Sequence, residues 1–246
     1  MIIIGIREIP EDWYYHLLKI NNDKIILVCF TNIDIQKHIN DIFIPLSTIE
    51  YNFIKNFNVK YLYPDEKIIE LFHNKSKFVD YMLLNFIENI PKTYVLNNKV
   101  IDENFDYPLI YKPQYSTNGR NMIIIKNIED YNNIKEKHII QKFIEDEYEY
   151  SMYLICENGK ILNHLTIRNK FNKYFIKTHN FTTYEIVKNL NINVIVQIIK
   201  DVNYNGGACV DFKVENNDIK IFEINPRFGG SLFTCDLFEE LMKIFL

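Results

Sequence analysis

Residues 208–231, with the sequence ACVDFKVENNDIKIFEINPRFGGS, constrain the fold of this chain more than any other stretch. Two segments in it, 209–214 and 220–225, alternate between side chains of opposite character, which is the two-residue period of a β-strand. The polar run Glu215–Asp218 between them tolerates a left-handed backbone and indicates a turn. The stretch is therefore predicted to form a β-hairpin.

This hairpin brings acidic side chains together on one face. If Glu215 pairs with Ile219 across a three-residue loop, Asp211 lies directly opposite Glu223, and Asn225 shares their face. Two facing carboxylates repel each other unless a cation lies between them, and oxygen ligands select a hard divalent ion. So small a ligand set suits Mg²⁺, or Mn²⁺, because the ion keeps waters and takes phosphate oxygens. The alternative is an ordinary amphipathic hairpin with a solvated polar face.

The residues that follow the hairpin favour a metal–phosphate site over that alternative. Pro226 ends the strand ladder, Arg227 supplies a planar cation, and the pair Gly229-Gly230 lets a ligand approach the backbone. If the two acids repel each other, replacing Glu223 with Gln should abolish activity and leave the stability of the free protein equal or slightly higher.

Composition bounds the remaining possibilities. The chain has 246 residues, enough for one large domain or two small ones, and its 48% hydrophobic content provides a proper core. A net charge of -4 gives no basic surface for nucleic acid. No apolar run reaches membrane-spanning length, and MIIIGI lacks the positive start of a signal peptide. The four cysteines are widely spaced, which argues against zinc and disulfides and favours a cytoplasmic protein.

Glycine is scarce, with seven residues in the whole chain. Gly206, Gly207, Gly229 and Gly230 flank the hairpin, which marks this region as one that needs backbone freedom. The abundance of Ile, Asn and Lys is typical of an AT-rich coding sequence, so the Asn-rich loops are interpreted as a matter of composition rather than of structural demand.

Residues 1–73 are predicted to form a small α/β unit. The patterns indicate strands at 2–6, 24–30, 43–44 and 59–63 and helices at 11–19 and 33–40. A dinucleotide-binding unit would need several glycines after its first strand, and only Gly5 is present there. The unit is therefore interpreted as a scaffold that can contribute to a substrate cleft.

The middle of the chain carries a lysine-bearing strand and a polar loop. A helical pattern over 68–89 is interrupted near Asn74-Lys75-Ser76, and strands follow at 92–96 and 108–113. Lys112, in the second strand, precedes the loop 114–120, whose backbone N–H groups and small polar side chains can hold phosphates. A solvated surface loop explains this segment about as well.

Alternating patterns dominate the second half of the chain. Strands are predicted at 122–125, 139–144, 151–156 and 160–170, with helices at 129–137 and 184–203. In the strand 160–170, a polar stripe that includes Arg168 lies on one face, and its simplest interpretation is a solvated face of the sheet.

Taken in order, these motifs resemble the ATP-grasp superfamily, in particular carboxylate–amine ligases similar to the ATP-binding modules of carbamoyl-phosphate synthetase and biotin carboxylase. The resemblance covers roughly residues 70–231, and EINPRFGGS is its most specific motif. It implies an α/β chain with an α+β C-terminal part. A small N-terminal parallel-sheet unit (1–73) would precede an ATP-grasp domain (74–246), made of a lid (about 93–140) and a catalytic antiparallel sheet (141–246).

The resemblance also implies roles for individual residues. Lys75 and Lys112 would contact phosphates, and the loop Ser116–Gly119, with Ser116, Asn118 and Gly119, would close over them. Gln141, Lys142, Phe143 and Ile144 would hold adenine, and Glu149 the ribose. Asp211, Glu223 and Asn225 would bind the metal, and Arg227 with Arg168 would steady the transferred phosphoryl group. Because the spacing from Ile144 to Glu149 is one residue longer than usual, Glu147 is a rival for the ribose.

The implied enzyme is an ADP-forming ligase that uses ATP and Mg²⁺ to activate a carboxylate as an acyl phosphate and join it to an amine. Its partners would be these small molecules, with no nucleic acid and no membrane, and a homodimer is allowed. The alternatives are a phosphotransferase without ligation and a non-catalytic nucleotide-binding module. Three departures from the family stand out: the phosphate loop has one glycine, the spacing from Ile144 to Glu149 is one residue longer, and the segment 171–183 lacks a Gly/Ser-rich run. The chain also ends soon after Ser231.

Overall fold

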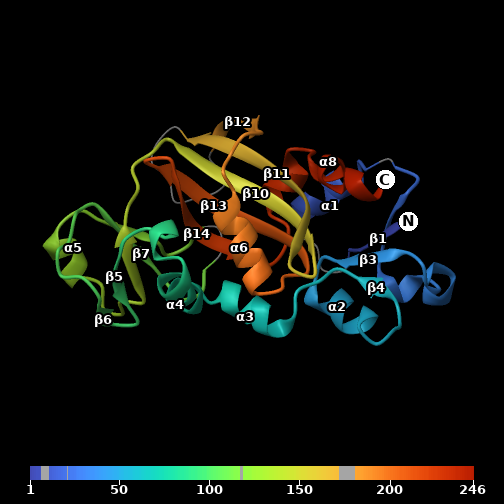
Figure 1. Cartoon of the computed structure of the whole chain (residues 1–246), viewed down its shortest axis with the longest axis horizontal. Coiled ribbons are helices and arrows are strands. Elements are labelled where there is room, and N and C mark those ends of the chain that lie inside the picture. Colours follow the sequence, from blue (N-terminus) through green and yellow to red (C-terminus); the bar gives the residue numbers. More distant parts are fainter. Residues whose placement is uncertain (7–10, 21, 117–118, 172–180) are drawn as a thin grey trace.

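Three β-sheets lie one after another along the long axis of the computed structural model, which describes residues 1–6, 11–20, 22–116, 119–171 and 181–246. Figure 1 shows the N-terminal sheet at one end, a second sheet at the other, and a five-stranded sheet between them. The predicted fold class is confirmed, because the N-terminal sheet is parallel and the other two are antiparallel.

The N-terminal sheet is parallel throughout, with the strand order β2-β1-β3-β4. Its central strand is buried along its whole length, as expected for a parallel sheet covered on both faces. The elements of this unit are β1 (Ile2–Gly5), α1 (Glu11–Leu17), β2 (Ile25–Val28), β3 (Ile42–Pro45), α2 (Thr48–Ile54) and β4 (Lys60–Tyr61).

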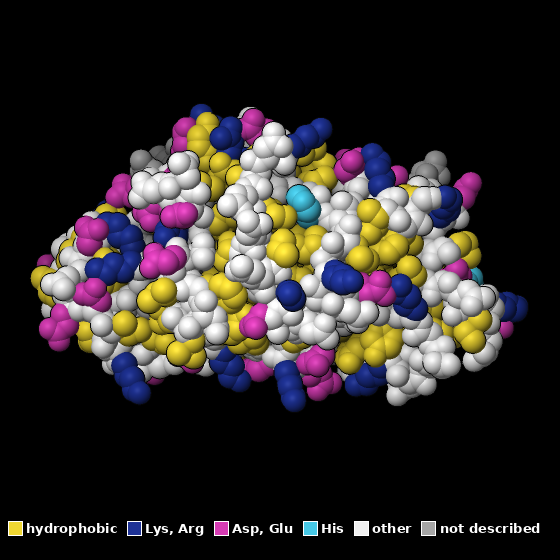
Figure 2. Space-filling view, viewed as in Figure 1, with side chains coloured by type: hydrophobic (Ala, Val, Ile, Leu, Met, Phe, Trp, Pro, Cys, Tyr) yellow, Lys and Arg dark blue, Asp and Glu magenta, His cyan; other side chains and the backbone are white. Residues whose placement is uncertain are grey.

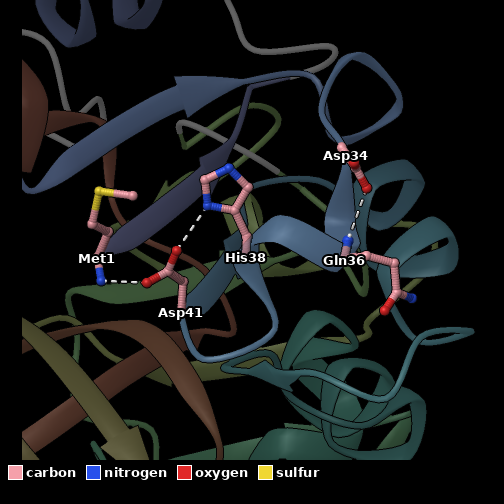
Figure 3. Close-up of polar contacts among 5 residues, drawn as sticks. All are labelled: Met1, Asp34, Gln36, His38 and Asp41. Atoms are coloured by element: carbon pink, nitrogen blue, oxygen red, sulfur yellow. Dashed lines mark hydrogen bonds and ion pairs between the residues drawn. The ribbon is translucent and has the colours of Figure 1, made fainter.

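The helix predicted over 33–40 is only the short 3₁₀ turn Ile35–His38. Its start is capped by Asp34, whose carboxylate accepts from the N–H of Gln36 at 3.2 Å. Just beyond the turn, the carboxylate of Asp41 accepts a hydrogen bond from the amino group of Met1 at 2.6 Å. Its other oxygen is hydrogen-bonded to the ring of His38 at 2.8 Å (Figure 3). The bonds of Asp34 to Gln36 and of His38 to Asp41 are local alternatives to the hydrogen bonds of a longer helix, and the chain enters β3 at Ile42.

Two helices join the N-terminal unit to the rest of the chain, α3 (Glu66–His73) and α4 (Lys75–Asn85). They are separated at Asn74, whose backbone is extended (φ -83°, ψ 99°) and whose side chain accepts from the N–H of Lys77 at 3.1 Å. Asn74 is therefore the N-cap of α4. The predicted interruption of the helix is confirmed, and Lys75 becomes the first residue of α4.

The lid is a small antiparallel sheet with the order β6-β5-β9-β7-β8. It has its own apolar core, which contains Tyr94, Leu109 and Ile140. Its helix is shorter than the predicted 129–137: α5 ends at Asn132, and residues 133–138 lead without a helix into β9. The elements are β5 (Thr93–Leu96), β6 (Lys99–Val100), β7 (Leu109–Lys112), β8 (Ile123–Ile125), α5 (Ile128–Asn132) and β9 (Ile139–Lys142).

The central sheet has the order β12-β11-β10-β13-β14 and a core on each face. One face packs against α3, α4 and α6, and the other against the N-terminal unit, α7 and α8. Figure 1 shows α6 lying across the first of these faces. The elements are β10 (Tyr148–Glu157), β11 (Lys160–Phe171), β12 (Phe181–Val187), α6 (Asn193–Asp201), β13 (Gly206–Glu215), β14 (Asp218–Asn225), α7 (Gly230–Thr234) and α8 (Phe238–Met242).

The long helix predicted over 184–203 is wrong in its first half. Residues up to Val187 belong to β12, which pairs with β11, and the helix α6 begins at Asn193. The segment Thr183–Val187 is rich in β-branched and aromatic residues, so it fits a strand once β11 offers an edge to pair with.

The predicted hairpin is confirmed, but its turn is tighter than expected. Glu215 pairs with Asp218, and the two loop residues Asn216 and Asn217 have positive φ values of 52° and 67°. This is the geometry of a two-residue type I′ turn. A β-bulge then shifts the register by one residue: Phe212 pairs with Ile221 and Asp211 with Glu223, so Phe222 on β14 is the extra residue and Asp211 still faces Glu223.

Asparagine also fills the other left-handed positions of the chain. Among the described residues other than glycine, the positive φ angles belong to Asp236 and to seven asparagines: Asn97, Asn98, Asn121, Asn158, Asn203, Asn216 and Asn217. Asn tolerates this conformation better than most residues, so here it replaces the scarce glycine. The interpretation of the Asn-rich loops as compositional is corrected by these turns.

In Figure 2, basic and acidic side chains are interspersed over the visible face, with apolar side chains between them. No helix in the part of the chain that the structure describes is long and apolar enough to cross a membrane.

Candidate functional site

Strand register places the two acids among the three predicted metal ligands on one face of the central sheet. Asp211 lies opposite Glu223 on β14 and opposite Ser151 on β10. The hydroxyl of Ser151 donates to Asp211 Oδ1 at 2.7 Å. We call the face that carries Glu149, Ser151, Asp211 and Glu223 the acidic face; the opposite face packs on α6.

Asn225 bridges the two acids. Its Nδ2 donates to Asp211 Oδ2 at 3.3 Å and to Glu223 Oε1 at 3.1 Å. Burial, and then the charge of Glu223, raise the pKa of Asp211 to about 6. Of the two facing acids, Asp211 is therefore the one whose pKa is raised.

Lys75 approaches the acidic face from the first turn of α4. Its ammonium group donates to Glu223 Oε2, and its side chain is only 8% exposed. Burial alone would raise the pKa of Glu223, but the ion pair with Lys75 and the amide of Asn225 hold it below its usual value. Glu223 is thus already neutralised by an internal cation, whereas Asp211 is not.

Lys112 ends β7 in the lid and points toward the same cluster. It is 6% exposed, and its Nζ lies 5.1 Å from the centre of the Phe222 ring. No carboxylate of the described residues lies within ion-pair distance of it. Burial, and then the charge of Lys75, lower the pKa of Lys112 to about 8. A buried ammonium without an anionic partner is costly unless an anion arrives to balance it.

The phosphate loop begins beside Lys75. The backbone N–H of Lys75 donates to the carbonyl of Gln114 at 3.0 Å, and Asn74 donates to the hydroxyl of Tyr115 at 2.9 Å. Ser116 follows with a buried hydroxyl that bonds to no described group. Gly119 has a φ of 64°, and the predicted ligand Asn118 lies outside the described residues.

The four residues predicted to hold adenine follow one another from β9 into the segment that leads to β10. Gln141 is 1% exposed; its Nε2 donates to Thr93 at 3.0 Å, while its Oε1 is buried without a partner. The N–H groups of Lys142 and Phe143 bond to carbonyls of the lid. The N–H of Ile144 makes no bond to a described group. The acceptor Gln141 Oε1 and the donor N–H of Ile144 are therefore both available to a ligand.

The two candidates for the ribose differ in position. Glu149 is on the acidic face, where burial, and then the charge of Asp211, raise its pKa to about 8. Glu147 is 51% exposed, and its carboxylate lies 3.5 Å from Lys170. Only Glu149 is close to the other predicted ligands.

Arg227 lies where the hairpin meets the N-terminal unit. It lines a small surface pocket with Pro45, Tyr63 and Phe228, and within the described chain it makes no ion pair. Its segment is fixed because the ring of Phe228 packs onto Gly207, where a Cβ would lie 2.4 Å from the ring.

The structure does not bring Arg168 to this cluster. Arg168 pairs with Tyr150 in the sheet register, so it lies on the face opposite Asp211. There its guanidinium stacks on Tyr148, 4.4 Å from the ring centre, and donates to Glu185. The predicted pairing of Arg168 with Arg227 is therefore not seen.

Several residues of the site were not predicted from the sequence. Ser151 supports Asp211, Phe222 lies under Lys112, and Lys213 is buried on the acidic face. Lys213 shares the strand alternation of Asp211, so the pattern itself could have identified it. The contacts of Ser151 and Phe222 depend on strand pairing and on the bulge, which the pattern does not encode.

The donor set fits Mg²⁺ with a polyphosphate better than a metal alone. Among the described residues no three histidines, cysteines or acids are grouped to hold an ion by themselves. Asp211, Glu223 and Asn225 would supply the ligands of the protein, and phosphate oxygens the remainder. Lys112, which is buried beside these acids without a carboxylate partner among the described residues, also favours a site for Mg²⁺ with a polyphosphate.

A family model described as ATP-grasp domain matches residues 73–231, well over half of the chain. The chain belongs to the ATP-grasp family. The match includes α4 with Lys75, the lid, and the hairpin with both acids. The predicted membership in this family is confirmed.

Two curated relatives and one solved structure illustrate the likeness. The chain is 28% identical over 186 residues to an uncharacterised protein of Methanocaldococcus jannaschii, with 70% of this chain and 44% of the relative covered. It is 29% identical over 199 residues to a D-alanine–D-alanine ligase of Petrotoga mobilis, with 70% and 66% covered. The chain thus spans less than two thirds of either relative.

The solved structure is a biotin carboxylase from Campylobacter jejuni in complex with β,γ-ATP. It matches with a TM-score of 0.61 at 15% identity, over 99% of this chain and 70% of the other. At this identity the likeness concerns the fold, and it confirms the predicted ATP-grasp fold.

Proposed function

We propose that the protein is an ATP- and Mg²⁺-dependent ligase that activates a carboxylate as an acyl phosphate and joins it to an amine. The observation that carries this proposal is the buried Lys112 from the lid, which has no carboxylate partner among the described residues and lies near a pair of acids from the central sheet. Such a cation and acid pair suits a bound metal–polyphosphate, and family membership of the chain supports ATP as that ligand.

In this proposal different elements of the chain bind different parts of ATP. Lys112 and Lys75 bind phosphate oxygens, and Ser116 and Gly119 cover them from the loop. Gln141 Oε1 accepts from the exocyclic amine of adenine, and the N–H of Ile144 donates to a ring nitrogen. Glu149 accepts from the ribose hydroxyls.

The reaction end of the site would lie at the acids. Asp211, Glu223 and Asn225 hold Mg²⁺, which when bound neutralises the phosphate charge and favours phosphoryl transfer. Arg227, which makes no ion pair with the described residues, binds the transferred phosphoryl group. The carboxylate oxygen attacks the γ-phosphorus and ADP leaves; the amine then attacks the acyl carbon, and phosphate leaves with the original carboxylate oxygen.

The test is a panel of carboxylate and amine pairs scored for ADP release, with mass spectrometry of the products and Lys112→Ala as the inactive control. A carboxylate labelled with ¹⁸O should transfer one labelled oxygen to phosphate when the amide forms. ADP release with a stable phosphorylated product and no amide would instead establish a phosphotransferase. Failure of every pair to release ADP above the Lys112→Ala background would contradict the proposal.

A further inference from the structure

Lys213 connects the metal-bearing strand to the segment that follows the lid. It is in β13, two residues after Asp211, and it is 6% exposed. Its ammonium donates to the carbonyl of Ile144 at 2.9 Å and to that of Asp146 at 2.8 Å. It also lies 5.7 Å from the ring centre of Phe143. We call residues 142–147 the hinge, so all three contacts are with the hinge.

Packing alone does not account for this lysine. Burial of an ammonium carries a desolvation cost, and an apolar side chain of the same length, such as Met, would fill the space without it. The bonds of Lys213 are made to two backbone carbonyls outside the strands: that of Ile144, which also accepts from the N–H of Asp146 at 3.1 Å, and that of Asp146. The charge therefore acts on the path of the hinge and on the nearby carboxylate of Glu149 rather than on the apolar core of the sheet.

The backbone conformation of the hinge determines where the groups proposed to recognise the base lie. The N–H of Ile144 belongs to the peptide group before the one whose carbonyl Lys213 binds, and it makes no bond to a described group. The Oε1 of Gln141, on the last strand of the lid, is likewise unpaired. Residues 141 and 144 lie at the two ends of the junction between the lid and the central sheet, and Lys213 fixes the backbone of this junction through its bonds to Ile144 and Asp146.

We propose that Lys213 is a positioning residue: it holds the hinge so that the base of the nucleotide is recognised in register with the metal-bearing strand. This inference rests on the proposed function, because it takes ATP as the ligand of the site. It predicts that Lys213 supports binding of the base and has little effect on binding of the phosphates.

The chain offers a closely matched control. Lys220 lies directly opposite Lys213 on β14, and its ammonium also donates to a backbone carbonyl, that of Glu88, at 2.6 Å. That bond links the hairpin to a 3₁₀ turn (Ile87–Asn89) instead of the hinge. Lys220→Met thus removes the same kind of bond from the same hairpin without changing the hinge.

The test compares two probes by calorimetry in the presence of Mg²⁺: a non-hydrolysable ATP analogue and inorganic tripolyphosphate, which has no base. Lys213→Met should lower the affinity for the analogue about tenfold or more, since two bonds to a charged donor are lost. The affinity for tripolyphosphate should stay within about twofold of that of the unsubstituted protein. Lys213→Arg, which keeps the donors, should restore much of the loss. Lys220→Met should change neither affinity.

Amide hydrogen exchange of the free protein supplies a measurement that needs no nucleotide. In Lys213→Met the hinge amides should exchange faster, while β13 and β14 exchange as in the unsubstituted protein. An equal loss of affinity for both probes, or unchanged amide exchange rates in the hinge, would overturn the inference. If Lys213→Met does not fold, Lys213→Gln, which retains one donor, should show a smaller loss for the analogue alone. A protein that binds the analogue but ligates nothing would refute only the proposed function.

Discussion

At the scale of single residues, Asp211 and Glu223 face one another but have different surroundings. Glu223 is neutralised by Lys75, whereas Asp211 is held by the hydroxyl of Ser151 and the amide of Asn225. In the folded protein the pKa of Asp211 is raised to about 6 from 3.8, so above pH 6 its charge opposes folding. The two acids therefore contribute to stability with opposite signs.

Isosteric replacement of each acid tests this difference. Asp211→Asn should leave the free energy of unfolding of the free protein at pH 7.5 equal or higher. Glu223→Gln should lower it by on the order of 1–3 kcal/mol, less than for a fully buried pair, because Lys75 loses its partner. Both variants should lose ADP formation. Urea unfolding beside a turnover assay decides the matter, and equal stability of the two variants would contradict the assignment.

The sequence alone led to a different expectation for Glu223→Gln. The strand pattern predicts the repulsion between the two acids, but it does not predict the ion pair with Lys75, which is 148 residues away from Glu223 in the chain. No periodicity encodes such a contact. Arg168 illustrates the same limit: its strand was predicted, but which face of the sheet its side chain would take depends on the pairing of β11 with β10.

Lys112 should make nucleotide binding depend on pH. Its pKa is about 8 in the free protein, and phosphate contact favours the charged form, so binding raises that pKa and takes up a proton. The affinity for ATP without metal should then fall as the pH rises from 7 to 9. Lys112→Arg stays charged over this range and should remove most of the decline. Calorimetry at both pH values measures it, and identical slopes for the two proteins would exclude Lys112 as the cause.

At the scale of elements, the hairpin shows what strand periodicity can and cannot predict. Alternation identified both strands and the facing acids. It did not identify the turn length, and the pairing of Asp211 with Glu223 is preserved only because the bulge at Phe222 compensates for the shorter turn. The bulge also places Phe222 beneath Lys112. A one-residue irregularity of this kind is decided by packing.

The turn itself is open to a direct test. Asn217 has a φ of 67°, a conformation that costs other L-residues about 1–2 kcal/mol and Asn less. Asn217→Ala should therefore lower the free energy of unfolding by about 1 kcal/mol, and Asn217→Gly should not lower it. Asn189, which is exposed between β12 and α6 and has no positive φ, supplies the control Asn189→Ala. Equal urea midpoints for the two alanine variants would refute the role of the turn.

At the scale of the whole molecule, the site is assembled from three separate parts of the chain. α4 supplies Lys75, the lid supplies Lys112 and Gln141, and the central sheet supplies Glu149, Asp211 and Glu223. Between the lid and the central sheet, the buried unpaired groups Lys112 Nζ and Gln141 Oε1 have no protein partner among the described residues. A ligand that satisfies both groups and the acids must touch both bodies at once.

Nucleotide binding should therefore slow amide exchange in two segments that belong to different sheets. With a non-hydrolysable ATP analogue and Mg²⁺, we expect protection in the lid at β7 and β9 and also at the acid-bearing ends of β13 and β14. The parallel strands β1 and β3 of the N-terminal unit, which carry none of the predicted nucleotide ligands, serve as the internal reference and should change little. Lys112→Ala should reduce both zones of protection together, because a ligand that bridges them cannot leave one without loosening the other. Protection confined to the lid, with β13 and β14 unaffected, would mean that the acids take no part in binding the nucleotide.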